Sequence, residues 1–266
     1  MSTFAEIRTA PSRNFKITVA YDGRGLSGWQ RQENGVTVQE LLEEAVGKVC
    51  GHRVIVWGSG RTDAGVHATG QVASFNTSSS RTPSQIIFGS NSLLPANIAI
   101  LKAEEAPPEF HARFSATGKK YTYDFLTTPI RHPHYAWKSW WVGARLRWDR
   151  VEECLPHLVG EKDFATFRSL GSQEKSTVRK IFRARLLSPE PELKRLELIG
   201  SGFLRHMARA IAGTVFEIGR GRVTPLDFPG LIASLNRALA GAAAPPQGLC
   251  LREVYYEPLE LADFQE

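Results

Sequence analysis

Cysteine is scarce in this 266-residue sequence, and the three that occur, Cys50, Cys154 and Cys250, lie far apart. Their number is odd, and no two of them form a CxxC pair. Disulfide frameworks need paired cysteines and zinc ribbons need closely spaced ones, so we expect neither. His132 and His134 have no second ligand pair at metal-binding spacing, and we expect a surface loop there rather than a metal site.

Long apolar runs are also missing. No stretch approaches the roughly 20 apolar residues that cross a bilayer, which predicts no membrane partner. Residues 1–14 contain an acid and lack the apolar core of a signal peptide, so we expect a short tail. The unpaired cysteines then predict a reducing, cytoplasmic location.

Cofactor motifs are a third absence. The sequence has no GxxxxGK[ST], GxSxG or HExxH. The segment GRGLSG, residues 23–28, matches GxGxxG, but the next helix is expected only from about Val38. A dinucleotide site needs that helix directly after the third glycine, because its amides face the pyrophosphate. We therefore expect a loop at residues 23–28 and no cofactor.

Positive charge, by contrast, is plentiful and concentrated. The net charge is +6 and the pI about 9.3. Between Lys175 and Arg222, eleven Lys or Arg stand against four Glu, so the rest of the chain is close to neutral. A concentrated basic region favours a polyanionic partner such as nucleic acid. The alternative is a solvated basic face without a partner.

The order of predicted elements in the first half indicates an α+β fold. Hydrophobic patterns predict strands and helices at residues 15–22, 38–50, 54–57, 71–75, 83–94 and 98–103. Thr37 and Glu40 form a capping box at the start of the first helix, and Gly51 ends it. The resulting order β-α-β-β-α-β is the split βαβ arrangement, an antiparallel sheet backed by two helices.

The second half repeats this order more loosely. Strands are expected at residues 119–128, 178–188, 194–201 and 249–257, and helices near 149–159, 205–218 and 225–239. We predict two related halves, residues 15–110 and 111–266, that form one mostly antiparallel sheet. Helices are expected on one side of it, and a central basic cleft between the halves.

The segment GSGRTDAGVHATGQVASF, residues 58–75, contains one carboxylate, Asp63, which is a candidate catalytic group. Asp63 directly follows Arg61 and Thr62 and precedes Gly65, between two expected strands. Aspartate and glycine are turn residues, so a plain turn is one interpretation. The other is a nucleophile that a cationic neighbour keeps ionised.

The late helix raises a question of charge. Its sequence from Arg205 is apolar on two sides, which is typical of a helix buried on both. Arg209 lies among these apolar residues, and an unpaired buried charge costs about 3–5 kcal/mol. Either Arg209 has a carboxylate partner from elsewhere in the chain, or it extends to solvent or binds phosphate.

An aromatic stripe follows the boundary between the halves. Tyr121, Tyr123 and Phe125 share one face of a predicted strand, beside Lys119 and Lys120. Aromatic side chains next to cations can stack on unpaired bases. The alternative is ordinary core packing.

Five sequence segments, taken together, are more specific for a protein family than any one of them alone. They are YDG…GWQRQ with TVQELLEEA, GSGRTDAGVHATGQVASF, FHARFSATGKKYTY, GSGFLRHMARAIAG and PPQGLCL, spread over about residues 15 to 256. In content and order they resemble the tRNA pseudouridine synthase A family, and RTDAGVHA is the most specific of them. The resemblance implies that Asp63 is the nucleophile, that Tyr121 lies against the target base and that Arg209 pairs with Asp63.

The resemblance also implies the remaining site residues and the reaction. Further substrate contacts are expected from Arg61, Phe203, Arg205 and Leu249, with no metal and no cofactor. The implied reaction is isomerisation of uridine to pseudouridine in the anticodon stem-loop of tRNA, around positions 38 to 40, by a homodimer. Three alternatives stay open: an RNA-binding protein of the same fold without activity, a nucleotide-dependent oxidoreductase using GRGLSG, and a structural protein with a basic surface.

Overall fold

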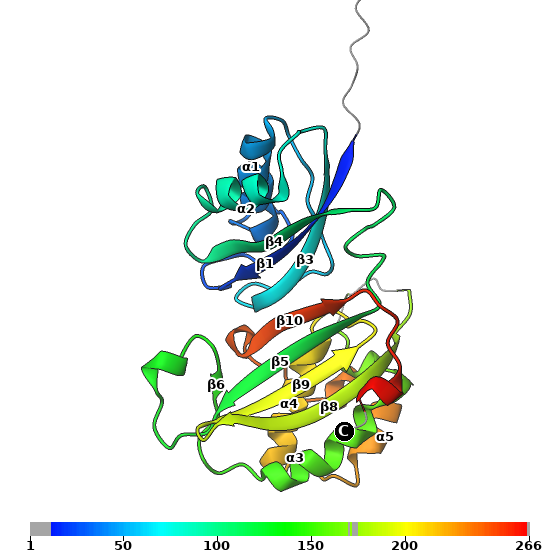
Figure 1. The fold of residues 1–266 in the computed structure, drawn as a ribbon. Helices are drawn as coiled ribbons and strands as arrows, with labels where there is room; N and C mark the ends of the chain where they lie inside the picture. Colours follow the sequence, from blue (N-terminus) through cyan, green and yellow to red (C-terminus); the bar gives the residue numbers. More distant parts are fainter. Residues whose placement is uncertain (1–11, 170, 172–174, 265–266) are drawn as a thin grey trace, which may run out of the picture.

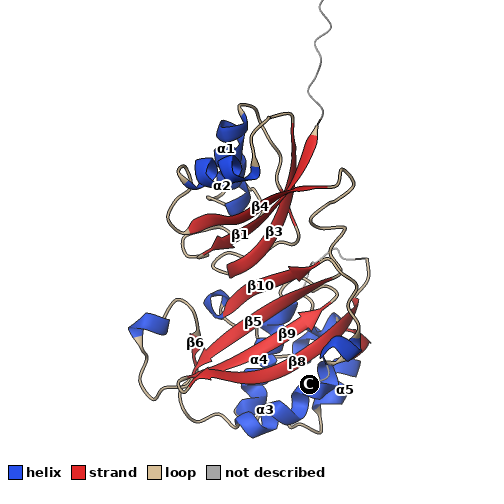
Figure 2. Cartoon of the chain, viewed as in Figure 1, coloured by secondary structure: helices blue, strands red, loops and turns tan. Residues whose placement is uncertain are grey.

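A single large sheet organises the computed structural model, which describes residues 12–169, 171 and 175–264. Among these residues ten strands join in the order β4-β1-β3-β10-β5-β9-β8-β7, with β2 paired to β3 and β6 to β5 (Figures 1 and 2). The strands are β1 (Arg13–Tyr21), β2 (Trp57–Gly58), β3 (His67–Thr77), β4 (Ile98–Ala106), β5 (Gly118–Leu126), β6 (Trp140–Trp141), β7 (Gly160–Asp163), β8 (Val178–Glu190), β9 (Leu193–Gly200) and β10 (Leu249–Tyr255). The α-helices are α1 (Val38–Cys50), α2 (Pro83–Asn91), α3 (Trp148–Cys154), α4 (Met207–Gly219) and α5 (Phe228–Ala233).

The first half has the predicted order β1-α1-β2-β3-α2-β4, and the α+β class is confirmed. β1 lies between β3 and β4 and is antiparallel to both. The side chain of Thr37 caps α1 and Gly51 ends it with φ 79°, as its sequence predicted. Thr82 and Gln85 form the capping box at the start of α2. α2 packs against β4 and against α1, so the two helices cover the outer part of the sheet.

The last strand joins the two halves. β10 is parallel to β3, where Cys250 lies opposite His67, and antiparallel to β5, where Leu251 lies opposite Tyr121. The other pairs of long strands are antiparallel, and the short strand β6 is parallel to β5. In Figure 1, β10 (red-orange) runs between the blue strands of the first half and the green and yellow strands of the second.

Several predicted boundaries were wrong. β1 starts at Arg13, two residues inside the expected tail, because Arg13 and Asn14 already pair with β3; residues 1–11 lie outside the described part of the chain. The helix expected near 149–159 ends at Cys154 and continues as a 3₁₀ turn that contains a proline. The helix expected at 225–239 is only α5, since Leu235 just beyond it has φ 53°.

Two short strands were not predicted. β6 has two residues and pairs with β5, and β7 is the polar segment GEKD, which pairs with β8. Neither has the alternating apolar pattern from which strands are predicted. In Figure 2, α4 lies behind the long strands of the second half, and α3 and α5 lie below them.

Burial is highest on α4, as its apolar sides predicted. Ten of its thirteen residues are buried, including Met207, Ile211 and Val215. Within the described residues no helix is both long and apolar enough to cross a membrane.

Candidate active site

The loop that carries Asp63 is a tight turn between β2 and β3. The amide of Val66 donates to the carbonyl of Asp63 at 3.1 Å, and Gly65 has φ 78°. A left-handed third residue is what glycine tolerates best in a turn of this kind. The hydroxyls of Tyr21 and Thr62 are hydrogen-bonded at 2.8 Å, which ties the turn to β1. The turn interpretation and the catalytic one are therefore compatible, because the turn presents the carboxylate.

A buried glutamine fixes the start of this loop. The amide side chain of Gln71, on β3, accepts a hydrogen bond from Ser59 Oγ at 2.7 Å and donates one to the carbonyl of Gly60 at 3.0 Å. Both ends of the loop are thus bonded to strands, and the aspartate between them has a defined position.

The segment GRGLSG is a loop, as predicted, and its last glycine lies against the acid loop. Gly28 has φ 88°, and a Cβ at this position would lie 2.6 Å from the carbonyl oxygen of Thr62. The amide of Trp29 donates to that same carbonyl at 3.1 Å. Glycine is required here by both the backbone conformation and the close approach.

The structure brings Asp63 and Arg209 together from opposite halves. Arg209 Nη1 donates to Asp63 Oδ2 at 2.9 Å, and Arg209 Nε donates to the carbonyl of Ala244 at 2.8 Å. The side chain of Arg209 is 15% exposed and that of Asp63 is 29% exposed. The carboxylate thus supplies the partner that the helix sequence required, and a face of it stays accessible.

A loop of small residues holds α4 in place. The amide of Ala244 donates to the carbonyl of Arg209 at 2.9 Å, which makes the contact reciprocal. The backbones of Gly213 and Gly241 meet so closely that a Cβ on Gly241 would lie 2.6 Å from the carbonyl carbon of Gly213. The composition of the segment AGAAAPPQG is therefore explained by a backbone-to-backbone contact with the helix.

His206 is a site residue that the sequence reasoning missed. Its Nε2 lies 3.4 Å from Asp63 Oδ1, on the other oxygen from Arg209. It stands just before α4 with φ 62°, in the left-handed region. Burial lowers the pKa of His206, opposed by Asp63 and assisted by nearby arginines, so the ring is neutral at pH 7. Its place three residues before Arg209 was the available signal, since such residues share a helix face.

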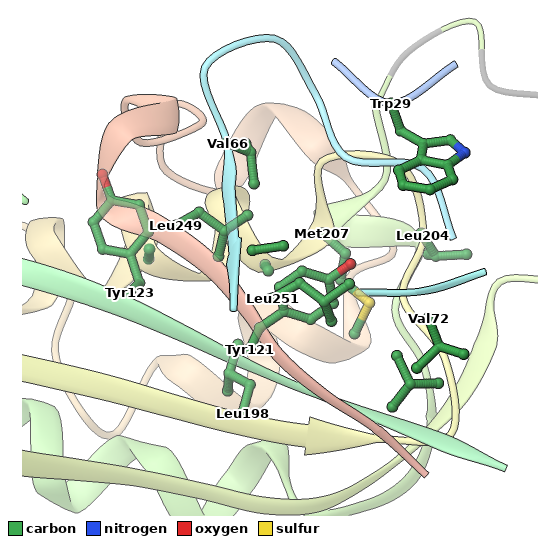
Figure 3. Packing of buried hydrophobic residues seen from close by; sticks show 14 of the residues in the cluster. Trp29, Val66, Val72, Tyr121, Tyr123, Leu198, Leu204, Met207, Leu249 and Leu251 are labelled. Atoms are coloured by element: carbon green, nitrogen blue, oxygen red, sulfur yellow. The ribbon is translucent and has the colours of Figure 1, made fainter. Parts of the chain in front are cut away.

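Tyr121 lies in the sheet beside the acid. It is 7% exposed, and Phe203 packs edge-on against it with ring centroids 4.9 Å apart. Its cross-strand neighbours are Leu198 and Leu251 (Figure 3). Burial raises the pKa of Tyr121 well above its usual range, and the charge of Asp63 adds to this effect, so the phenol is neutral.

The remaining predicted site residues are Arg61, Arg205 and Leu249. Arg61 is exposed and donates to Gln30 at 3.1 Å, whereas the cation paired with the acid is Arg209. Arg205 is also exposed, at the start of the helix segment. Leu249 is buried but lies opposite Tyr123 in the strand register, two pairs away from Tyr121.

The rest of the aromatic stripe is core. Tyr123 is 1% exposed and its hydroxyl donates to the carbonyl of Pro245, and Phe125 is fully buried. Figure 3 shows the ring of Tyr123 beside Leu249, away from Tyr121. Only the first ring of the stripe therefore lies beside the acid loop.

The site is thus built from a carboxylate, an arginine, a neutral imidazole and a buried phenol. Such a set can support an electron-poor carbon or move a proton, while apolar walls limit the entry of water. Among the described residues no group of three His, Cys, Asp or Glu side chains could hold a metal ion.

Comparison with known proteins decides the family. A family profile described as tRNA pseudouridine synthase matches residues 17–115 and 155–257. The chain belongs to this family. It is 43% identical over 244 residues to a tRNA pseudouridine synthase A of Geotalea uraniireducens (strain Rf4), covering 92% of this chain and all of the relative. It is 44% identical over 245 residues to one of Geobacter sp. (strain M21), covering 92% and 99%.

Membership of the tRNA pseudouridine synthase family also gives the class of reaction. The chain is an isomerase. The first matched segment contains Asp63 and the second contains Arg209, whereas Tyr121 lies between the two segments. The two matched segments therefore meet at the ion pair.

Proposed function

We propose that this chain converts uridine to pseudouridine in the anticodon stem-loop of tRNA, around positions 38 to 40. The observation that carries the proposal is the ion pair between Asp63 and Arg209 beside the buried ring of Tyr121. We expect the extruded pyrimidine to lie beside this ion pair, against Tyr121 and Phe203. The relatives' printed names supply tRNA as the substrate class.

The reaction keeps all atoms of the nucleoside. The bond from N1 to C1′ breaks, uracil turns within the pocket, and C5 bonds to C1′; the proton of C5 leaves and N1 gains one. Asp63 either bonds to C1′ for the duration of this exchange or takes a proton from the neighbouring sugar carbon. Arg209 holds the carboxylate in place, and Tyr121 with Phe203 covers the free base.

The basic region assists the capture of RNA. A paired uridine must leave its stack at a cost of a few kcal/mol, and contacts between Lys or Arg and phosphates offset it. Binding then weakens steeply with salt. We also propose that the protein is a cytoplasmic homodimer, and light scattering in solution tests its oligomeric state.

Replacement of the acid tests the function directly. We expect Asp63→Asn to abolish pseudouridine formation while its affinity for tRNA stays within about tenfold of wild type, because the phosphate contacts remain. Asp149→Asn is the matched control, since Asp149 is also paired with an arginine but is exposed on α3. Mass spectrometry of modified tRNA gives the yield, and substantial turnover by Asp63→Asn would contradict the proposal. A wild-type protein that binds tRNA without turnover would instead be the inactive RNA-binding protein.

A further inference from the structure

Three neighbouring rings, tilted against one another by 43° and 37°, form a partly exposed ring cluster beside the acid loop. Trp57, on β2, lies 5.8 Å from His111 between ring centroids, and His111 lies 4.5 Å from Phe114. Phe114 is 78% exposed and Trp57 38% exposed. His111 and Phe114 belong to the connection from β4 to β5, which lies at the right of the molecule in Figure 1. The rings therefore present an aromatic surface to solvent where the two halves meet.

Hydrogen bonds within the connection from β4 to β5 fix this ring cluster. Nδ1 of His111 accepts from the amides of Arg113 at 3.1 Å and of Phe114 at 3.4 Å, so the ring is held by its own turn. The amide of Ala112 donates to Ser74 Oγ on β3 at 3.0 Å. β2 pairs with β3 at this same serine, which sets the tryptophan against the histidine. The surface is thus formed before any ligand binds.

Two cations lie at this place, Arg113 on the ring cluster and Lys119 against the acid loop beside it. The guanidinium of Arg113 lies over the ring of Phe114, 5.6 Å from its centroid. Nζ of Lys119 lies 3.1 Å from where a Cβ on Gly60 would stand, against the loop that carries the acid. Burial, together with the charges of Arg113 and Arg179, lowers the pKa of Lys119 to about 8. The charges acting on this lysine are cations, so an anion placed here is strongly favoured.

We propose that Trp57, His111 and Phe114 form a stacking platform for an unpaired base of the RNA substrate, with Arg113 and Lys119 binding the adjoining phosphates. The proposal rests on the proposed function, which supplies RNA as the substrate. Aromatic rings stack on any base, and cations beside them match the charge of the backbone. A stem-loop offers unpaired bases next to the paired region, and the platform holds one of them while the target uridine enters the site.

Binding of RNA by ring variants tests the platform. The probes are a fluorescent hairpin with a single-stranded loop and a blunt duplex of the same stem. We expect Phe114→Ala to weaken hairpin binding about tenfold and to leave duplex binding unchanged, whereas Phe114→Tyr keeps the affinity. Phe88→Ala is the matched control, because Phe88 is 75% exposed and lies on α2. Both positions are exposed, so the variants should fold like the wild type.

Each outcome decides the proposal. Loss confined to the hairpin supports stacking on an unpaired base. An unchanged affinity, an equal loss with both probes, or a loss in Phe114→Tyr as large as in Phe114→Ala overturns it. Fluorescence anisotropy measures binding without turnover, so this test is independent of catalysis. If the wild type isomerises tRNA and Phe114→Ala binds the hairpin with full affinity, only the platform is refuted. Absence of pseudouridine from wild-type reactions refutes only the proposed function.

Discussion

The two members of the ion pair are held in different ways. Asp63 stands on a turn of irregular backbone, fixed by hydrogen bonds and by a glycine that lies against it. Arg209 stands on a buried helix, and a loop without regular structure accepts from its guanidinium. The two groups are therefore displaced by different changes. Asp63 moves if the neighbouring backbone moves, whereas Arg209 moves if α4 and its loop separate. Substitutions that act on one side only separate these contributions.

Removal of the guanidinium should have the largest effect. We expect Arg209→Ala to lower turnover at least about 100-fold, because the carboxylate loses the group that orients it. The free energy of unfolding should fall by about 1–2 kcal/mol, less than for a fully buried pair, since Asp63 keeps access to water. Pseudouridine yield and chemical denaturation give the two values.

The matched control for this variant is Arg195→Ala. Arg195 binds both oxygens of Asp124 within the sheet of the second half, at 2.6 and 2.7 Å. Its loss should lower stability by a similar amount and leave turnover near wild type. A wild-type turnover and melting temperature in Arg209→Ala would refute the pairing argument.

Separation of α4 from its loop should cost mainly stability. In Gly213→Ala the new methyl group collides with the backbone of Ala242, and we expect a loss of about 2–3 kcal/mol. Gly230→Ala, in α5, has nothing within 4 Å and should be neutral or slightly stabilising. Thermal unfolding compares them, and equal melting temperatures would show that the loop is not held against the helix.

Displacement of the acid loop should affect turnover more than stability. Gly28→Ala places a methyl group 2.6 Å from the carbonyl oxygen of Thr62, and we expect turnover to fall about tenfold. Gly25→Ala shares the positive φ, at 72°, but meets no atom within 4 Å. Both variants should lose about 1 kcal/mol from backbone strain, and only Gly28→Ala should lose activity. Equal kinetics in the two would remove the close approach from the explanation.

The smallest expected effect concerns pH. Burial lowers the pKa of His206, so the unfolded chain takes up a proton at a higher pH than the folded chain. The free energy of unfolding should therefore fall as the pH drops below about 6.5, the usual histidine value. Asn tolerates the left-handed backbone, and His206→Asn should reduce this loss by less than about 1 kcal/mol between pH 7 and 5. Identical pH dependence in denaturant titrations would show that His206 is not the group responsible.

Much of the fold could be predicted from periodicity and caps. Thr37 and Gly51 bound α1 as expected, and the order of elements in the first half matches the structure. The helix around Arg209 was predicted to be buried from its own residues, which led to the need for a carboxylate. These features are local, so a single segment contains the information.

Contacts between distant segments could not be predicted in the same way. The position of Ala244 on Arg209, the approach of Gly28 to Thr62 and the register that sets Leu249 opposite Tyr123 depend on how the chain packs. The sequence suggests Arg61, two residues away, as the cation beside Asp63, but Arg61 extends toward Gln30 and Arg209 is the partner. Proximity along the chain is a poor guide to pairing when a helix from the other half reaches the loop.

The position of β10 has a consequence for biosynthesis. This strand pairs with β3 immediately after the loop of Asp63 and with β5 at Tyr121, so it closes the sheet between the two halves. A nascent chain on the ribosome can fold its first half early, but β3 then exposes an unpaired edge until residues 249–255 emerge. The contact between the two halves at the candidate site is therefore completed only after residues 249–255 have been made, and a chain that stops before residue 249 leaves the edges of β3 and β5 unpaired by β10.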